Sequence, residues 1–313
     1  MKLFGNKKYL ILIILSFIFC FNKTFAIQNN IILKINNIII TSIDVENEIN
    51  YLKTLNEEFL NLDDKTIYNV AKNSLIRETI KKNEIYKYVN EIKLDENYLE
   101  DLIRKKYLAI GFNSKEEFLF FIQENNLKIE TIKNKFATEA IWNQLIFSKY
   151  SDKVKVDEHQ LRKKISEIQN NKINIYFLSE ILFEIPNAEN YEKKFIEIEN
   201  KIKEIGFENA ASIYSISDSS KLGGKIGWVE ETYLSSELKK KLRNTDIGEI
   251  TKPTSTPGGF LILKINEIKK KEIKYDLEKE VKKMINIEKN KQFNQFSNIY
   301  FNKIKMDTVI NEL

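Results

Sequence analysis

The chain has 313 residues, of which 42% are hydrophobic and 30% are charged, and its formal net charge is +5. This hydrophobic fraction is typical of a globular protein, so it excludes wholesale disorder and a polytopic membrane protein. The length accommodates one large domain or two smaller ones.

The first 26 residues have the three regions of a secretory signal peptide. A positive start with three lysines precedes a mainly apolar run from Tyr9 to Phe21, and Ala26 offers a small residue before a cut. As a helix this run spans only about 20 Å, whereas the hydrocarbon core of a membrane is about 30 Å thick. We therefore expect a cleaved signal peptide over residues 1–26, a periplasmic protein and no stable membrane insertion.

The single cysteine and the charge balance both belong to this segment. Cys20 follows Phe19, where a lipoprotein signal has a small residue, so we expect neither lipidation nor thiol chemistry in the mature chain. Removal of residues 1–26, which hold four Lys and no acidic residue, leaves 46 basic and 45 acidic residues, a net charge of +1. Such a surface gives no electrostatic footprint for nucleic acid. A retained N-terminal segment, which would tether the protein to a membrane, remains an open alternative.

Local signals predict a short hairpin and then helices in the N-terminal half. Capping patterns begin at Thr41 and Ser114, and apolar residues follow each at helical spacing. The hairpin is expected at 31–40, around the pair Asn36-Asn37. The helices are expected at about 43–60, 65–90, 95–109, 114–125 and 129–150. The only histidine, His159, has polar neighbours and is expected on the surface.

Turn-forming residues are concentrated in the following segment. All three prolines and seven of the nine glycines lie between residues 186 and 259. This distribution predicts a turn-rich mixed unit between helical regions. Its first strand is expected at 173–185 and a helix at 189–205. A long amphipathic helix is expected at 272–305 and a strand at 307–313. The apolar stripe of the helix is expected to pack on the N-terminal helices.

Three glycine-containing patterns identify the mixed unit. In chain order they are GG-x-x-GW at 223–228, G-E-I-x-x-P at 248–253 and G-F-x-I-L-K-I at 259–265. Together they resemble the parvulin (rotamase) family of peptidyl-prolyl isomerases. With its signal and helical flanks, the whole chain resembles the SurA-type periplasmic chaperones, although SurA has two parvulin domains and this chain has room for one.

The resemblance implies an α+β fold with a defined domain order. A mostly helical N-terminal chaperone module at 27–171 is completed by a C-terminal helix and strand at 269–313. The parvulin-like α/β domain at 172–268 is inserted between them. Partners are expected to be unfolded or extended polypeptides, including outer-membrane protein precursors, and neither a metal nor a cofactor is required.

The resemblance also assigns the active-site positions. The two family histidines fall on Glu180 and Leu261, and the Cys or Asp position falls on Ser217 or its neighbour Asp218. Thr256 is a usual neighbour of the second histidine. The Met and Phe of the apolar cup fall on Leu234 and Leu238, and the substrate-binding set is completed by Phe260 and Trp228, although Trp228 is expected mainly as a packing residue.

These replacements leave two functions open. A binding protein with a degenerate isomerase site is favoured, because both histidines are absent. An active peptidyl-prolyl isomerase with a variant site is the alternative. Exposed apolar side chains would hold clients, and the candidates are aromatic: Phe118, Phe120, Phe121, Trp142 and Phe147.

Overall fold

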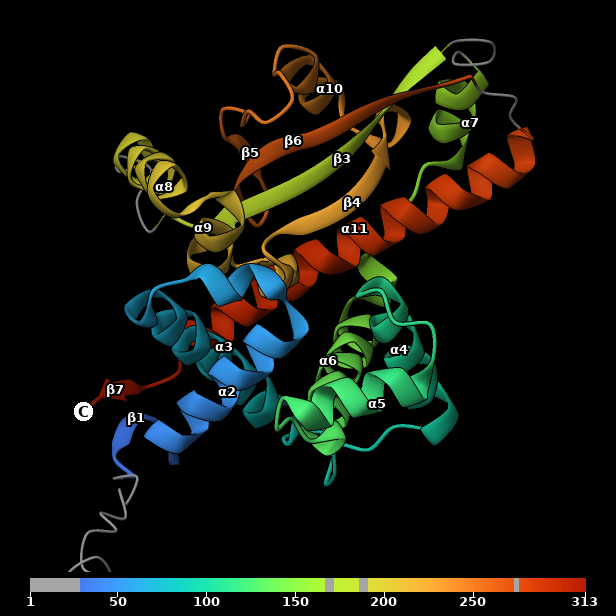
Figure 1. The fold of residues 1–313 in the computed structure, drawn as a ribbon. Coiled ribbons are helices and arrows are strands. Elements are labelled where there is room, and N and C mark those ends of the chain that lie inside the picture. The colour runs from blue at the N-terminus through green and yellow to red at the C-terminus, as the bar shows by residue number, and fades with distance from the viewer. Residues whose placement is uncertain (1–28, 167–171, 186–190, 273–275) are drawn as a thin grey trace, which may run out of the picture. The chain divides into compact units, whose positions relative to one another are not determined.

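The computed structural model describes residues 29–166, 172–185, 191–272 and 276–313 (Figure 1). The expected signal peptide at 1–26 lies outside the described residues. The remainder, Ile31–Leu313, forms one compact unit. None of its described helices is both long enough and apolar enough to cross a membrane.

A small antiparallel sheet brings the two ends of this unit together. Its strand order is β2 (Ile38–Thr41), β1 (Ile31–Ile35), β7 (Ile310–Glu312). Asn36 adopts a φ of 50° in the turn between β1 and β2, a conformation that Asn tolerates better than most residues. The predicted hairpin and C-terminal strand are both confirmed.

The N-terminal helices follow their capping signals. They are α2 (Ser42–Leu55), α3 (Asp64–Ile85), α4 (Glu96–Ala109), α5 (Lys115–Glu124) and α6 (Ile129–Tyr150). Thr41 and Asp44 form a full capping box at α2, and the Ser114 side chain caps α5.

Two of the predicted helix ends are too late. The first helix ends at Leu55, because the Asn56 side chain accepts a hydrogen bond from the Glu58 backbone and starts the separate 3-10 turn η1 (Glu57–Asn61). The second helix ends at Ile85 rather than near residue 90.

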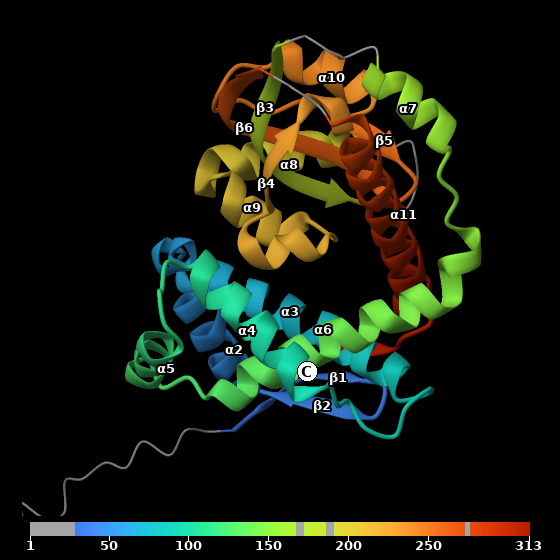
Figure 2. The ribbon, with the colours of Figure 1, turned by 90° about the vertical axis from the view of Figure 1, so that its right-hand side faces the viewer.

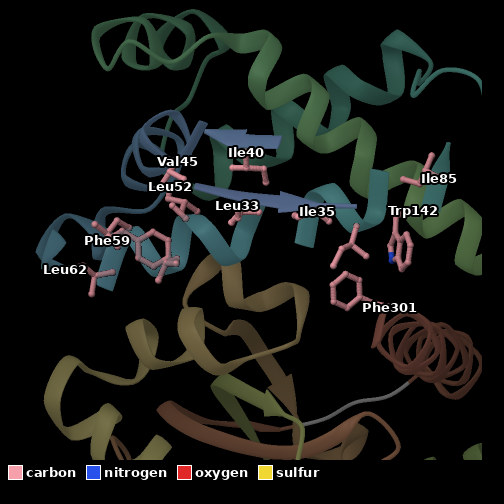
Figure 3. Close-up of a cluster of buried hydrophobic side chains, with 14 of the residues drawn as sticks. Leu33, Ile35, Ile40, Val45, Leu52, Phe59, Leu62, Ile85, Trp142 and Phe301 are labelled. Atoms are coloured by element: carbon pink, nitrogen blue, oxygen red, sulfur yellow. The ribbon is translucent and has the colours of Figure 1, made fainter. Parts of the chain in front are cut away.

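The C-terminal helix α11 (Leu277–Met306) shares a hydrophobic core with the N-terminal elements (Figure 3). Phe301 packs there with Leu33, Ile35 and Trp142, all at most 5% exposed. The Trp142 indole also donates a hydrogen bond to Ser297 Oγ at 2.8 Å. The prediction that this helix begins near residue 272 is wrong, because strand β6 continues through Glu272; the expected helical residue Ile273 lies outside the described residues.

The second sheet is antiparallel, with the order β4 (Lys225–Glu230), β3 (Lys172–Phe183), β6 (Gly259–Glu272), β5 (Thr254–Thr256) (Figures 1 and 2). On one face it packs against α8 (Tyr191–Ile205) and α9 (Phe207–Tyr214). On the other it packs against α10 (Ser236–Arg243) and the short turn η5 (Glu231–Tyr233). The α+β fold class is thus confirmed.

A further helix lies between α6 and strand β3 in the chain. It is α7 (Glu158–Ser166), which packs on α11 through Ile165, Val281 and Met284. His159 is exposed near its start, as predicted.

Candidate functional site: a polar cluster beside the second sheet

Glu180 and Leu261, to which the resemblance assigns the two histidines, lie on one face of the sheet. In the register of β3 and β6, Glu180 pairs with Leu263 and Leu182 pairs with Leu261, so Leu261 is the diagonal neighbour of Glu180. This is the face that carries the buried residues Tyr176, Leu178 and Leu263. The strand pairing brings Glu180 and Leu261 close together, and only Glu180 is polar.

Glu180 is held by two serine hydroxyls. Ser217 Oγ donates to Glu180 Oε1 at 2.6 Å, and Ser219 Oγ donates to the same oxygen at 2.8 Å. Ser217 also caps the 3-10 turn η4 (Asp218–Leu222). It is therefore Ser217, and not Asp218, that meets Glu180, while Ser219 is a member of the cluster that the sequence reasoning missed.

A glycine allows η4 to approach Glu180 this closely. Gly224 has a φ of 78°, its N–H donates to the Ser219 carbonyl, and its own carbonyl accepts from the Glu180 N–H at 2.8 Å. A Cβ at this position would lie 2.3 Å from the Glu180 carbonyl oxygen. The GG-x-x-GW pattern thus has a structural reason next to the candidate site.

The apolar positions split between the two faces of the sheet. Leu234 is 7% exposed and packs with Leu238 and Leu261, which are half-buried, on the Glu180 face. Phe260 packs on the opposite face, with ring centroids 5.8 Å from Phe183 and 4.9 Å from Tyr191. The structure therefore places Phe260 apart from the leucines with which the sequence interpretation grouped it.

Thr256 lies at the end of β5. Its hydroxyl donates to the Gly259 carbonyl and closes the turn into β6. Among the described residues it makes no hydrogen bond to the Glu180 cluster, so its role here is that of a turn residue.

Trp228 is more exposed than expected. It keeps 43% of its surface accessible on the edge strand β4. Its ring lies 5.2 Å from that of Phe177, and the Lys269 ammonium lies 4.0 Å from its centroid. The indole therefore packs on Phe177 and Lys269, while a large part of its surface stays exposed on the edge strand.

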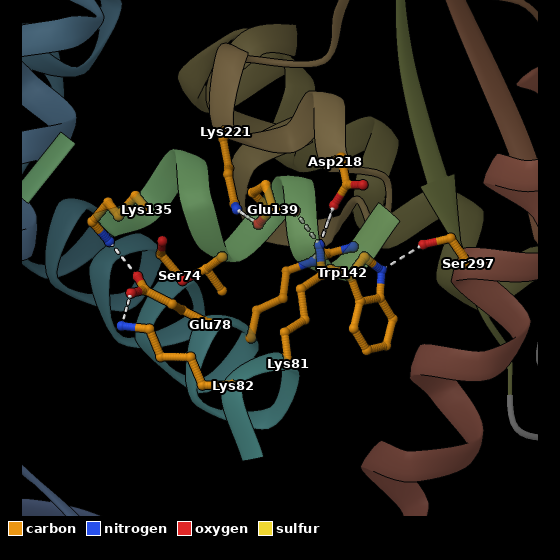
Figure 4. A network of polar contacts seen from close by, with 12 residues as sticks. Ser74, Glu78, Lys81, Lys82, Lys135, Glu139, Trp142, Asp218, Lys221 and Ser297 are labelled. Atoms are coloured by element: carbon orange, nitrogen blue, oxygen red, sulfur yellow. Dashed lines mark hydrogen bonds and ion pairs between the residues drawn. The ribbon is translucent and has the colours of Figure 1, made fainter. Parts of the chain in front are cut away.

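Asp218 belongs to a second cluster, with side chains of the N-terminal helices (Figure 4). Its Oδ1 lies 3.0 Å from Lys81 Nζ of α3, and Lys81 also donates to Glu139 of α6 at 2.6 Å. Lys221 of η4 forms an ion pair with Glu139. We call Lys81, Glu139, Asp218 and Lys221 the η4 ion cluster.

Charges in the η4 ion cluster stabilise one another. Burial alone would raise the pKa of Asp218, but Lys81 and Arg77 outweigh it and hold that pKa well below its usual range. Burial likewise opposes the ionisation of Glu139, and Lys221 and Lys81 reverse the effect, so its pKa is also lowered. The Lys81 pKa is raised, since Asp218 and Glu139 outweigh its burial. Asp218, Glu139 and Lys81 are therefore charged at neutral pH.

The aromatic candidates for client binding also divide. Phe118 and Trp142 are fully buried core residues, and Phe121 packs against the core around Phe118. In contrast, Phe120 is 67% exposed and Phe147 is 59% exposed. Only these last two present most of their side chains to solvent.

Residues 180–267 match the family model of the PPIC-type PPIASE domain, a rotamase. The chain carries a parvulin-type rotamase domain. The residues that form the Glu180 cluster all lie within the matched range.

Curated relatives and solved structures extend the likeness. Chaperone SurA from Pseudomonas fluorescens (strain Pf0-1) is 26% identical over 161 residues, covering 49% of this chain and 38% of SurA. Chaperone SurA from Pseudomonas aeruginosa is 24% identical over 164 residues, covering 49% and 39%. The match thus spans less than two fifths of the length of these relatives.

Two solved structures have low overall similarity to this chain. A structure of the SurA-like chaperones PEB4 and Cj1289 from Campylobacter jejuni is 17% identical and covers 91% of this chain and 99% of its own, with a TM-score of 0.36. PrsA from Bacillus subtilis is 18% identical and covers 89% and 92%, with a TM-score of 0.28. Because both TM-scores are below 0.5, the likeness to SurA rests on the sequence matches alone.

Proposed function

We propose that the protein is an ATP-independent periplasmic chaperone for unfolded outer-membrane proteins, with a rotamase site that binds proline segments but isomerises them weakly. The observation that carries this proposal is the cluster at Glu180: a carboxylate bonded to Ser217 and Ser219 lies where the resemblance assigns a histidine. The SurA likeness supports chaperone function, and the exposed Phe120 and Phe147 offer apolar contacts for clients.

The chemistry of the cluster is poorly suited to isomerisation. The barrier of about 20 kcal/mol comes from amide resonance, and a catalyst lowers it by stabilising the twisted amide with oriented hydrogen bonds. Glu180 as a carboxylate offers acceptors only, and the Ser217 and Ser219 hydroxyl protons are both directed to it. No donor of the cluster is therefore free for a substrate carbonyl in the described arrangement.

Two measurements on the purified protein test this proposal. NMR exchange on a short proline peptide reports isomerase activity, and light scattering of a diluted unfolded outer-membrane protein reports chaperone activity. We expect suppressed aggregation without marked acceleration of the slow cis-to-trans exchange. Strong acceleration would overturn the weak-site proposal, and aggregation equal to that of a buffer control would overturn the chaperone proposal.

An active isomerase is the second candidate, because the Ser217–Glu180 contact retains a polar pair at the family positions. A double variant, Glu180→His with Leu261→His, discriminates the two candidates. Activity that appears only in the double variant supports a site that has lost its catalysis. Activity that is present in the natural chain and is lost in Ser217→Ala and Glu180→Gln supports the variant catalytic site.

Periplasmic location rests on the signal pattern at residues 1–26. Mass analysis of the protein recovered from cells tests it. A chain that starts near Ile27 supports cleavage and release, whereas a chain that still contains the apolar run supports the membrane-tethered alternative.

A further inference from the structure

A cavity of about 200 Å³ lies among α2, α3, α4, α6 and η4. Much of its lining is apolar, and both the helices and the η4 turn contribute side chains. Helix α2 contributes Tyr51, Leu52 and Leu55 to the apolar lining. Helix α6 contributes Phe136, and η4 contributes Leu222. The volume corresponds to roughly seven waters at about 30 Å³ each, less than a pocket for a drug-sized molecule.

Nearly all charged groups around this cavity are compensated. Lys135 pairs with Glu48 at 2.6 Å and also with Glu78. Glu139, Asp218 and Lys221 belong to the η4 ion cluster. Because these charged groups already have ion-pair partners, they do not require an additional bound ion.

Lys106 of α4 is the exception. Its Nζ donates only to the Leu55 carbonyl oxygen, at 3.4 Å, and no carboxylate of the described residues lies within ion-pair distance of it. Burial lowers its pKa, and no neighbouring carboxylate offsets this effect. A half-buried ammonium beside apolar walls is a binding group for an anion that carries an apolar part.

We propose that this cavity binds the C-terminal residue of an extended polypeptide, with the carboxylate on Lys106 and an apolar side chain among Leu52, Leu55 and Phe136. A chain end brings a carboxylate and a whole apolar side chain into the same small space. An internal Asp or Glu brings only one or two methylene groups. It also requires the chain both to enter and to leave the cavity. The proposal deepens the chaperone function proposed above and rests on it.

Calorimetry with a matched peptide pair tests the proposal. The probes are acetyl-Ala-Ala-Leu with a free carboxylate and the same peptide with a C-terminal amide. We expect the purified protein to bind the carboxylate form about tenfold more tightly, the gain typical of one charge-assisted hydrogen bond. Equal binding of the two forms, or no binding of the carboxylate form, would overturn the proposal.

Two variants on α4 assign the effect to one side chain. Lys106→Met should abolish the preference for the carboxylate. Lys105→Met removes a charge from the neighbouring position, where the ammonium is 65% exposed and pairs with Asp101, and should keep the preference. A preference that survives in Lys106→Met, or that is lost equally in both variants, contradicts the assignment to Lys106.

A readout on the unaltered protein covers the case in which Lys106→Met does not fold. An amine-reactive reagent followed by peptide mass spectrometry measures the labelling of Lys106. The carboxylate peptide should protect Lys106, while the amide peptide and the exposed Lys105 show no protection. Labelling that is unchanged by the carboxylate peptide overturns the proposal.

Octanoate separates the two sources of an apolar carboxylate. Weaker binding than that of the peptide supports a polypeptide end, and tighter binding overturns it in favour of a lipid-derived acid.

Aggregation assays on the same samples distinguish the failure of the Lys106 site from the failure of the chaperone function. A protein that suppresses aggregation without distinguishing carboxylate from amide refutes the Lys106 site only, whereas one that fails to suppress aggregation refutes the chaperone function.

Discussion

Two polar clusters meet at the η4 turn, and the carboxylate in each has a different kind of partner. On the sheet side, Glu180 is bonded to the neutral hydroxyls of Ser217 and Ser219. On the helical side, Asp218 is paired with the almost fully buried Lys81. The comparison indicates that η4 is held mainly from the helices, where charges are paired, while the Glu180 side carries only hydroxyl–carboxylate bonds.

Replacement of Lys81 should have the largest effect on this arrangement. Its side chain is 1% exposed, so Lys81→Met removes a buried charge from between Glu139 and Asp218 while the apolar stem is kept. We expect the free energy of unfolding to fall by about 3 to 5 kcal/mol, the range for breaking a buried pair. Urea denaturation of the purified protein measures it.

The neighbouring Lys82 is the matched control. It is 35% exposed and pairs with Glu78 within the same helix. Lys82→Met should cost about 0.5 kcal/mol or less. If the two variants lose equal stability, the η4 ion cluster is not the main attachment of the turn.

Gly224 tests the sheet side of the same turn. Gly224→Ala would place a Cβ 2.3 Å from the Glu180 carbonyl oxygen at a φ of 78°. We expect a loss of about 2 to 4 kcal/mol, from left-handed backbone strain together with overpacking. Thermal and urea unfolding report the loss.

Gly227→Ala separates these two causes. Gly227 has a similar φ of 90°, but a Cβ there would have nothing within 4 Å. Only the backbone strain remains, so about 1 to 2 kcal/mol is expected. A cost for Gly227→Ala as large as that for Gly224→Ala would show that close approach to Glu180 contributes nothing.

The sequence predicted the parts of this site that depend on local rules. The capping boxes, the hairpin and the glycine patterns all act over a few residues. The separation of Phe260 from Leu261 was also predictable, because consecutive residues of a strand face opposite sides, and grouping Phe260 with the leucines ignored this period.

Other features depend on contacts that the sequence does not display. The Lys81–Asp218 pair joins residues 137 positions apart. Its members are an ordinary helix lysine and an ordinary turn aspartate in the sequence, so no spacing marks them. The exposure of Trp228 depends on β4 being an edge strand, which only the strand order β4-β3-β6-β5 reveals.

Removal of the Ser217 hydroxyl should lower the stability less than Lys81→Met or Gly224→Ala does. Ser217→Ala deletes one of the two donors to Glu180 Oε1, and Ser219 continues to donate at 2.8 Å. We expect a loss of about 1 kcal/mol in urea denaturation. Ser255→Ala on the exposed part of β5 is the control and should change stability by less than about 0.5 kcal/mol. A Ser217 effect no larger than the control would mean that the hydroxyl–carboxylate contact does not stabilise η4.

The smallest effect belongs to Asp218, and pH distinguishes it from a packing defect. Its side chain is 48% exposed and solvent screens its pairing, so Asp218→Asn should cost about 1 kcal/mol or less at pH 7. Burial opposes ionisation, but Lys81 and Arg77 prevail and lower the folded-state pKa below the usual value near 3.8. Its stabilisation is therefore fully present above pH 4 and is lost as the pH falls through the folded-state pKa. Urea denaturation at pH 7 and below pH 4 should show the difference between the natural protein and Asp218→Asn shrinking with acid, whereas a constant difference would mean that the variant acts through altered packing and not through charge.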